Sequence, residues 1–252
     1  MSRYPIAKHG LIAPLLALLA LAPALPAHAA DGPILITQEK AIAGNVTPGD
    51  TPGFPVTLSL PGSYILASNL QPPAGKAGIK IASNEIAIDL NGFRLNGASV
   101  ATTGINGAAF ESITIRNGTI TGFDAYGLFS IGTRWIVEDM RVVKNGAQGI
   151  HVGDYSTVRG TTVTRNGSYG INCGFSCLIE DSNSSQNGAA GVVAVASTVL
   201  GNVIINNAGL GITGIFAGSG NNTLVGNNGG AANPQVDGAV ELHPNACFPA
   251  CP

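Results

Sequence analysis

Acidic and basic side chains recur at a fixed interval in the middle of the chain. Arg159 stands midway between Glu138 and Glu180 in the sequence. With Asp139 and Asp181, the two glutamates could form an acid/base pair or a calcium site. An arginine between two carboxylates favours their ionised forms, whereas a general acid must hold its proton near neutrality, so this pattern disfavours hydrolysis.

The same charges have a structural interpretation. The sign alternates along one column, which reads Asp89, Arg116, Glu138, Arg159 and Glu180. Opposite charges one strand apart stabilise each other by roughly 0.2–1 kcal/mol per exposed pair. The column therefore favours a charge ladder, and catalysis by Arg159, Glu138 and Glu180 is the alternative. Asp139 and Asp181 alternate with glycines and are expected at corners.

A second set of residues carries the aromatic rings and amides that suit sugar binding. Its members are Tyr126, Phe129, Gln148, His151, Tyr169 and Asn172. Aromatic faces pack on sugar rings, with on the order of 1 kcal/mol for each contact, while amides and imidazole hydrogen-bond to hydroxyls. The set predicts a carbohydrate-binding face, which Asp154 and Tyr155 could extend. The alternative is that the rings shield strand edges and that His151 is an ordinary surface residue.

Four cysteines form two close pairs, which are Cys173 with Cys177 and Cys247 with Cys251. Export would permit them to oxidise, and local closure is the simplest of the three possible pairings, so we predict these two disulfides. A zinc site is the alternative, but so few histidines stand near the cysteines that we predict no metal site.

A sequence repeat with a nearly constant period must position all of these groups. The pattern Asn-[Gly/Ala]-x-x-Gly-[Ile/Val] begins at Asn145, Asn166, Asn187 and Asn207, and looser copies reach back to Gly78. Each unit holds three short β-branched runs separated by Gly, Asn and Asp, which favour strands and corners. Such short strands must stack on their neighbours at about 4.8 Å, which predicts a solenoid of parallel strands with about seven coils.

The repeated asparagines are predicted to occupy the corners of this solenoid. Their stacked side-chain amides can bond to the backbone at a tight turn, and asparagine tolerates positive φ. The alternative is that Asn-Gly marks β-hairpins. Hairpins need paired strands on both sides of a two-residue turn, whereas the period here is that of a whole coil.

The repeats, together with residues 86–92 and 113–122, resemble the right-handed parallel β-helix proteins of the pectin-lyase-like superfamily. The resemblance covers residues 78–228 and implies an all-β, single-stranded right-handed parallel β-helix. Residues 30–77 would form an N-terminal cap or lead-in, and residues 229–252 a C-terminal cap. In β-helix lyases an arginine polarises the substrate or abstracts a proton, a role that would fall to Arg159, and calcium would be the cofactor. The catalytic motifs of the polygalacturonase-like, alginate epimerase-like and pectate-lyase-like members are absent from the sequence, so no active site is carried over.

Residues 1–29 have the pattern of a secretory signal peptide. Arg3 and Lys8 precede an apolar stretch that ends at Leu25, and Ala27-His28-Ala29 follows, which predicts cleavage near Ala29. The apolar stretch is shorter than the roughly 20 residues of a membrane-spanning helix, and no later stretch is long enough. We therefore expect a secreted or periplasmic protein without a membrane span.

Composition excludes further classes of protein. Charged residues make up 10% of the 252 residues and hydrophobic residues 45%, which excludes a disordered chain. The net charge is −2 and basic residues form no run, so nucleic acid is not an expected partner. The sequence thus predicts an exported, non-catalytic polysaccharide-binding or structural module without a cofactor. The partner would be a polysaccharide or cell-surface glycan, and the alternative is a polysaccharide lyase acting on an acidic glycan.

Overall fold

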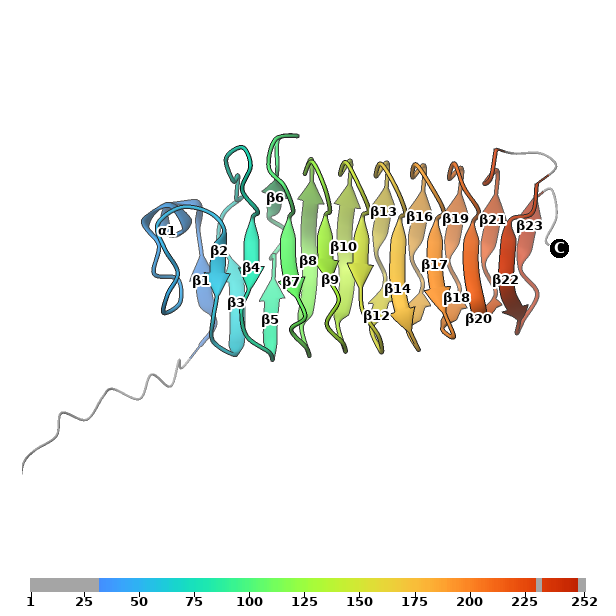
Figure 1. Cartoon of the computed structure of the whole chain (residues 1–252), viewed down its shortest axis with the longest axis horizontal. Helices are drawn as coiled ribbons and strands as arrows, with labels where there is room; N and C mark the ends of the chain where they lie inside the picture. Colours follow the sequence, from blue (N-terminus) through green and yellow to red (C-terminus); the bar gives the residue numbers. More distant parts are fainter. Residues whose placement is uncertain (1–31, 230–232, 249–252) are drawn as a thin grey trace, which may run out of the picture. The chain divides into compact units, whose positions relative to one another are not determined.

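The computed structural model describes residues 32–229 and 233–248, and these residues form a parallel β-helix. All of the strand pairings among them are parallel, and each strand pairs with the equivalent strand of the next coil (Figure 1). No antiparallel pair joins the described strands, so the hairpin interpretation of the Asn-Gly sequences is wrong.

Three faces, which we call A, B and C, make up the wall of the β-helix. Face A contains β2 (Val56–Leu58), β4 (Ile79–Ile81), β7 (Ile105–Ala108), β9 (Leu128–Ser130), β11 (Ile150–Val152), β14 (Ile171–Phe175), β17 (Val192–Val195), and the first parts of β20 (Ile212–Gly220) and β22 (Val236–Glu241). Face B contains β1 (Ile34–Ile36), β3 (Gly62–Leu66), β5 (Ile86–Asp89), the first halves of β8 (Thr114–Thr121) and β10 (Ile136–Val143), β12 (Thr157–Arg159), β15 (Leu178–Glu180), β18 (Thr198–Leu200) and the second parts of β20 and β22. Face C contains β6 (Arg94–Asn96), the second halves of β8 and β10, β13 (Thr162–Thr164), β16 (Asn183–Ser185), β19 (Val203–Ile205), β21 (Thr223–Val225) and β23 (Ala246–Phe248).

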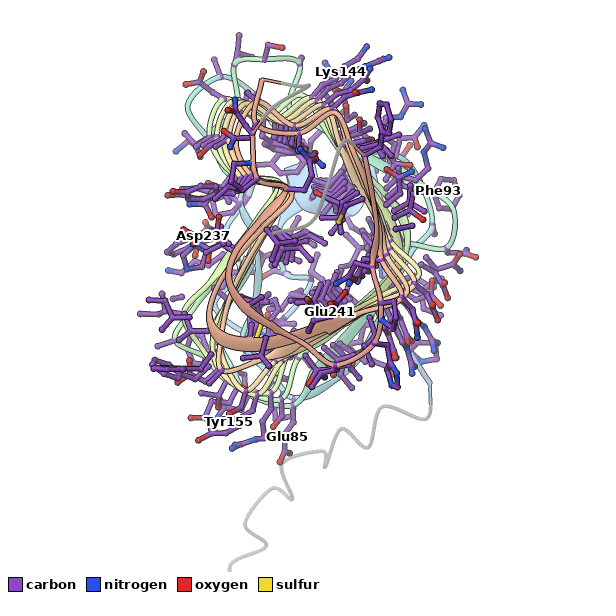
Figure 2. The ribbon with its side chains drawn as sticks, turned by 90° about the vertical axis from the view of Figure 1, so that its right-hand side faces the viewer. Glu85, Phe93, Lys144, Tyr155, Asp237 and Glu241 are labelled. Carbon is purple, nitrogen blue, oxygen red and sulfur yellow. A yellow bond between two sulfur atoms is a disulfide. The ribbon has the colours of Figure 1, made fainter. Side chains whose placement is uncertain are left out.

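The core is a stack of aliphatic side chains inside the coils. Val137 lies in register with Val158, and Val158 with Ile179, and all three are fully buried. Because alternate residues of a strand point to opposite faces, their neighbours Glu138 and Arg159 project outward. Figure 2 shows the inward side chains filling the middle of the coils, while Lys144 and Asp237 lie on the outside.

The structure has about nine turns, where the repeat predicted about seven. Two additional turns arise because strands form within the predicted caps. β2 pairs with β4 ahead of the first recognised repeat, and β22 and β23 pair with β20 and β21 after the last. The one helix of the described residues, α1 (Gln38–Ala43), follows β1 and is capped by Thr37, whose Oγ1 accepts from the Lys40 amide at 3.1 Å. The predicted boundaries at residues 29, 77 and 228 stay predictions, and residues 1–29 lie outside the described residues.

The repeated asparagines form a continuous ladder inside one corner. Nδ2 of Asn145 donates to Oδ1 of Asn166 at 3.0 Å, and Nδ2 of Asn166 donates to Oδ1 of Asn187 at 3.0 Å. The predicted bonds to backbone are also present, since Asn166 Nδ2 donates to the Val142 carbonyl at 3.1 Å. Positive φ was assigned to the wrong residue, because the residues before the asparagines take it, with φ of 57° at both Lys144 and Arg165. That bend turns the following asparagine into the interior.

The glycine of the repeat is required by space rather than by backbone conformation. A Cβ on Gly149 would stand 2.4 Å from Cγ1 of Val163 and 2.7 Å from Nδ2 of Asn166 in the next coil. One contact therefore explains why asparagine and glycine recur together. The ladder asparagine of each coil packs on the glycine of the preceding coil.

Candidate functional site

The charge column on face B is confirmed as a stack of neighbouring side chains. Asp89 pairs in register with Arg116, Glu138 with Arg159, and Arg159 with Glu180. Nε of Arg116 lies 3.1 Å from Oδ2 of Asp89, and Nε of Arg159 lies 2.9 Å from Oε2 of Glu138. The side chains of both arginines are 54% exposed, so these ion pairs meet water.

The electrostatics of Arg159 oppose a role in proton abstraction. The hydrogen bond to Glu138 and the negative charge of that carboxylate raise the pKa of the Arg159 guanidinium above its ordinary value, and Glu180 and Asp139 add to the effect. A group that abstracts a proton must first be deprotonated, so these neighbours make Arg159 less available as a base. The geometry matches a structural ladder, and a catalytic role for Arg159, Glu138 and Glu180 stays a prediction.

Asp139 and Asp181 occupy the corner between faces B and C. Their φ values are 53° and 49°, and the glycines with which they alternate, Gly160 and Gly201, also have positive φ. A Cβ on Gly160 would stand 2.7 Å from Oδ1 of Asp139, so the carboxylate of one coil occupies the space that a side chain would need in the next. Among the described residues, no group of three or more His, Cys, Asp or Glu could hold a metal ion.

Five of the six predicted sugar-binding residues come together on face A, and we call them the aromatic–amide cluster. They are Tyr126, Phe129, Gln148, His151 and Asn172, which lie on β9, β11, β14 and the turns before them. The ring centroids of Tyr126 and Phe129 are 4.9 Å apart, and those of Phe129 and His151 are 5.2 Å apart. The rings thus form one connected surface rather than two separate platforms.

The amides of Gln148 and Asn172 both contact the imidazole of His151. Its Nδ1 lies 3.0 Å from Oε1 of Gln148, to which Nδ2 of Asn172 also donates at 3.2 Å, and 3.4 Å from that Nδ2. The shorter contact, to an oxygen that can only accept, favours the tautomer in which Nδ1 carries the proton. Burial lowers the pKa of His151 because the charged imidazolium loses hydration, so the ring is neutral at neutral pH. A neutral ring that donates from Nδ1 to Gln148 carries its lone pair on Nε2, which can accept a hydrogen bond from a hydroxyl.

Tyr169, the sixth residue, lies in the predicted column but outside the ring contacts. Its carbonyl accepts from the Gly149 amide at 3.0 Å, which places it one coil beyond Gln148. Asp154 does not join the cluster through its side chain, because Oδ1 accepts from the Phe175 amide at 2.8 Å and closes a turn. Tyr155 is 62% exposed and has a φ of 57° at the same turn.

The first predicted disulfide is present. Cys173 and Cys177 are bonded, with their Cα atoms 6.3 Å apart and both side chains buried against face A. The second prediction falls partly outside the described residues, because Cys251 is not among them.

A group of cations on face C was missed by the sequence analysis. Arg94, Arg141, Lys144 and Arg165 line a shallow hollow with several threonines. A search for runs of basic residues could not find them, because they come from three coils and only Arg141 and Lys144 are close in the chain. The sequence analysis compared the outward residues of the strands that now form face B from coil to coil. The same comparison for the strands of face C would have placed Arg94 and Arg141 in one column.

The family assignment follows from the repeated coils. The model of the right-handed β-helix region matches residues 98–235, which is more than half of the chain. The chain belongs to this right-handed β-helix family. A comparison with curated proteins found no match.

Solved structures share the right-handed β-helix at low sequence identity. A point mutant of the periplasmic alginate epimerase AlgG aligns with a TM-score of 0.56 and 15% identity, over 68% of this chain and 47% of that chain. The A-module of the mannuronan C-5 epimerase AlgE6 from Azotobacter vinelandii aligns with a TM-score of 0.55 and 14% identity, over 88% of this chain and 81% of that one. The AlgE4 A-module from the same organism gives 0.52 and 15%, over 80% and 69%. This β-helix chain spans about half the length of the AlgG structure, and the likenesses show the fold.

The described part of this right-handed β-helix protein contains no helix that is long and apolar enough to cross a membrane. The predicted signal peptide, at residues 1–29, lies outside that part.

Proposed function

We propose that this protein is an exported right-handed β-helix module that binds a polysaccharide through the aromatic–amide cluster without cleaving it. The observation that carries the proposal is the convergence of two aromatic rings, two amides and one neutral imidazole on three successive coils of face A. Apolar ring faces beside hydrogen-bonding groups of fixed orientation are the combination that a sugar ring requires.

The spacing of the cluster favours an extended glycan over a single sugar. Tyr126 and Tyr169 stand two coils apart in one column, which corresponds to about 9.6 Å along the β-helix. A chain lying across the coils would meet the rings first and the amides of Gln148 and Asn172 next. The structural likeness to alginate and mannuronan epimerases supports a polysaccharide as the ligand, and the pattern of residues 1–29 supports export.

We propose no turnover, cofactor or metal, because the positive and negative side chains of the charge column neutralise each other. Arg159 is held by Glu138, so the residues that a lyase or glycosidase would need are paired with each other. The aromatic–amide cluster contains no carboxylate that could serve as a general acid.

Retention in native gels that contain a panel of polysaccharides tests binding. Tyr126→Ala and Phe129→Ala are each expected to weaken retention about fivefold, since an aromatic contact contributes on the order of 1 kcal/mol. Tyr155→Ala is the matched control, because it removes an exposed tyrosine outside the cluster. Unchanged retention in both cluster variants would contradict the proposed site.

Mass spectrometry and NMR of the same polysaccharides after incubation with the protein, with and without calcium, test the absence of turnover. We expect an unchanged panel. Unsaturated products would show the alternative, a lyase, while addition of water would show hydrolysis and a changed sugar configuration would show epimerisation. Any of these three results would overturn the non-catalytic part of the proposal.

A further inference from the structure

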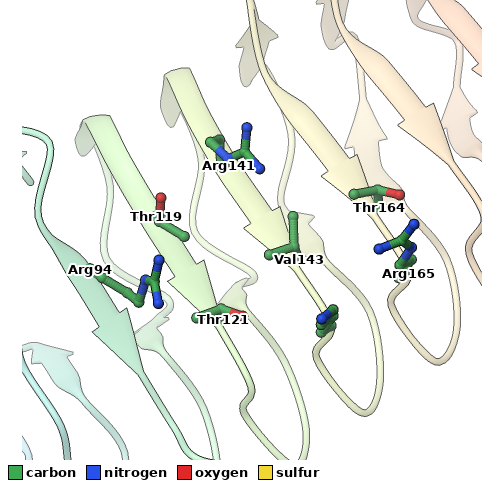
Figure 3. A pocket seen from close by; sticks show the side chains of 8 residues that line it. Arg94, Thr119, Thr121, Arg141, Val143, Thr164 and Arg165 are labelled. Carbon is green, nitrogen blue, oxygen red and sulfur yellow. The ribbon is translucent and has the colours of Figure 1, made fainter.

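Face C carries a hollow of about 290 Å³ whose rim is basic and whose floor is made of short side chains. The cations are Arg94, Arg141, Lys144 and Arg165, and we call this feature the basic groove. Figure 3 shows the labelled arginines on β6, on β10 and directly after β13, with Thr119, Thr121 and Thr164 between them. The groove therefore crosses four successive coils.

The cations of the basic groove form no ion pair with a carboxylate in the described part of the chain, whereas the other arginines there do. Within residues 32–229 and 233–248, the salt bridges use Arg116, Arg134 and Arg159, each with a carboxylate. None of those ion pairs involves a cation of the groove. Among the described residues, the one side-chain hydrogen bond made by these four cations is to a neutral group, since Nε of Arg165 donates to Oε1 of Gln186 at 2.9 Å.

Two of the cations are also placed where they repel each other. Val143 pairs in register with Thr164, so Lys144 and Arg165 follow at the same corner of adjacent coils, about 4.8 Å apart along the β-helix. Like charges on neighbouring strands are destabilising. On face B the same fold alternates the sign at every coil, so this repulsion is a local property of face C that bound negative charge would relieve.

The shape and the donors of the groove identify the class of ligand. Arginine presents paired N–H groups that match the two oxygens of a carboxylate or sulfate, and threonine hydroxyls add neutral hydrogen bonds. Because the four cations come from three of these four coils, a small anion would meet only part of them, whereas a chain with repeated negative charges would meet them all. No aromatic side chain lines the groove, so the stacking platform that single-stranded nucleic acid uses is missing.

We propose that the basic groove binds an anionic polysaccharide, one whose sugars carry carboxylate or sulfate groups. This site is separate from the aromatic–amide cluster, because it lies on face C and uses charge rather than ring faces. The anionic chain runs along the coils from Arg94 towards Arg165, with its acidic groups against the arginines and its hydroxyls over the threonine floor.

The test compares two double variants that remove the same charge. Arg141→Gln with Arg165→Gln removes two cations of the groove, and Arg116→Gln with Arg134→Gln removes two paired, exposed arginines outside it. The probes are polygalacturonate and dextran sulfate, with unmodified dextran as the neutral probe and polyphosphate and single-stranded DNA as phosphate polyanions. Retention in native gels is measured for the whole protein, and circular dichroism confirms that each variant is folded.

The expected result is that the unaltered protein is retained by at least one anionic glycan and not by dextran, and that retention falls at high salt. The groove variant should bind about tenfold more weakly and the matched variant should bind as the unaltered protein does. Equal loss in both double variants would show a net-charge effect and overturn the site. Retention by polyphosphate or DNA alone, or by none of the charged probes, would overturn the ligand class.

This experiment is independent of the proposed function. Tyr126→Ala and Phe129→Ala leave the basic groove intact, so they are expected to keep the part of the retention that high salt removes and to lose only the part that persists at high salt. If the aromatic–amide cluster fails its own test while the groove variant loses retention, face C is the polysaccharide site and face A is not.

Discussion

Nδ2 of Asn187 lies 2.9 Å from Oδ1 of Asn207 in the next coil, and both side chains are almost fully buried. The same Nδ2 also lies within hydrogen-bonding distance of the Val163 carbonyl, at 3.1 Å, and of Ser184 Oγ, at 3.2 Å. Oδ1 of Asn187 accepts in turn from the backbone and side chain of Asn166. One amide thus satisfies groups from three coils.

Asn187→Ala is therefore expected to destabilise the protein strongly. It leaves several buried donors and acceptors without partners, which should lower the free energy of unfolding by about 3 kcal/mol. Urea denaturation followed by circular dichroism measures the change. Thr223→Ala, at an exposed outward position of β21, is the control and should change stability by less than about 0.5 kcal/mol. Equal midpoints for the two variants would contradict a stabilising role for the ladder.

The lowered pKa of His151 predicts a pH-dependent contribution to stability. The unfolded chain binds the imidazole proton more readily than the folded chain, so stability from this group is complete above the ordinary pKa of about 6.5 and is lost as pH falls towards the lower folded pKa. His151→Gln should reduce the loss of urea stability on acidification through this window. His243→Gln, at an exposed position, should leave the loss unchanged. Identical pH profiles for the unaltered protein and the two variants would contradict a contribution of His151 to the pH dependence of stability.

Protonation of His151 should also weaken polysaccharide binding at the aromatic–amide cluster. The imidazolium donates from both ring nitrogens, so Nε2 no longer accepts a hydrogen bond from a hydroxyl. Titration of a retained glycan with the unaltered protein, as pH falls below about 6.5, should show weaker binding. His151→Gln should bind with no such step, and a step of the same size in that variant would contradict the role of Nε2.

Arg159→Gln is expected to cause a small, salt-sensitive loss of stability. The variant breaks the exposed ion pair with Glu138 and leaves two carboxylates, Glu138 and Glu180, facing each other across a neutral residue. The difference in urea midpoint from the unaltered protein should shrink at high salt, because screening weakens both the lost attraction and the new repulsion. Glycan retention at both proposed sites should be unchanged. A polysaccharide that the unaltered protein cleaves and the folded variant does not would instead make Arg159 catalytic.

The disulfide between Cys173 and Cys177 should contribute modestly to stability. It closes a loop with a sequence separation of four residues, for which chain entropy predicts about 2 kcal/mol. The double variant Cys173→Ala with Cys177→Ala should fold and lose about that much in urea denaturation. A thiol assay on the unfolded, unreduced protein should find no free thiol at these two positions.

The course of the chain could be predicted from the sequence because every coil repeats the same steric demands. Val137, Val158 and Ile179 were placed in one inward column, and the structure confirms the register residue by residue. The same register carried over to the outward residues, so the charge column and the cluster around His151 were predicted correctly as neighbours. The prediction of positive φ at the repeated asparagines was wrong. Asparagine is common both at positive φ and in buried ladders, and composition alone does not distinguish these two roles.

Groups outside the repeat pattern were harder to predict. The additional coils at β2 and β22 lack the repeat glycine directly before the strand, where Pro55 and Gln235 stand instead. A second ladder, in which Asn202 Nδ2 donates to Asn222 Oδ1 at 3.0 Å, was missed because its earlier positions are filled by Ser182 and Thr161. Contacts that depend on side-chain direction, such as Tyr126 on Phe129, required the coordinates.

The asparagine ladder has a direction, and Gln235 ends it. Asn227 donates its Nδ2 to Oε1 of Gln235 at 3.0 Å, and Gln235 returns Nε2 to the Asn227 carbonyl at 3.1 Å. Gln235 occupies the position of the repeat glycine, since its carbonyl accepts from the Ile212 amide as the Gly211 carbonyl accepts from Val192. A side chain fits there because no further asparagine of residues 32–229 and 233–248 packs on it. Whole coils added or removed upstream would therefore leave Gln235 and its two hydrogen bonds with the last ladder asparagine unchanged.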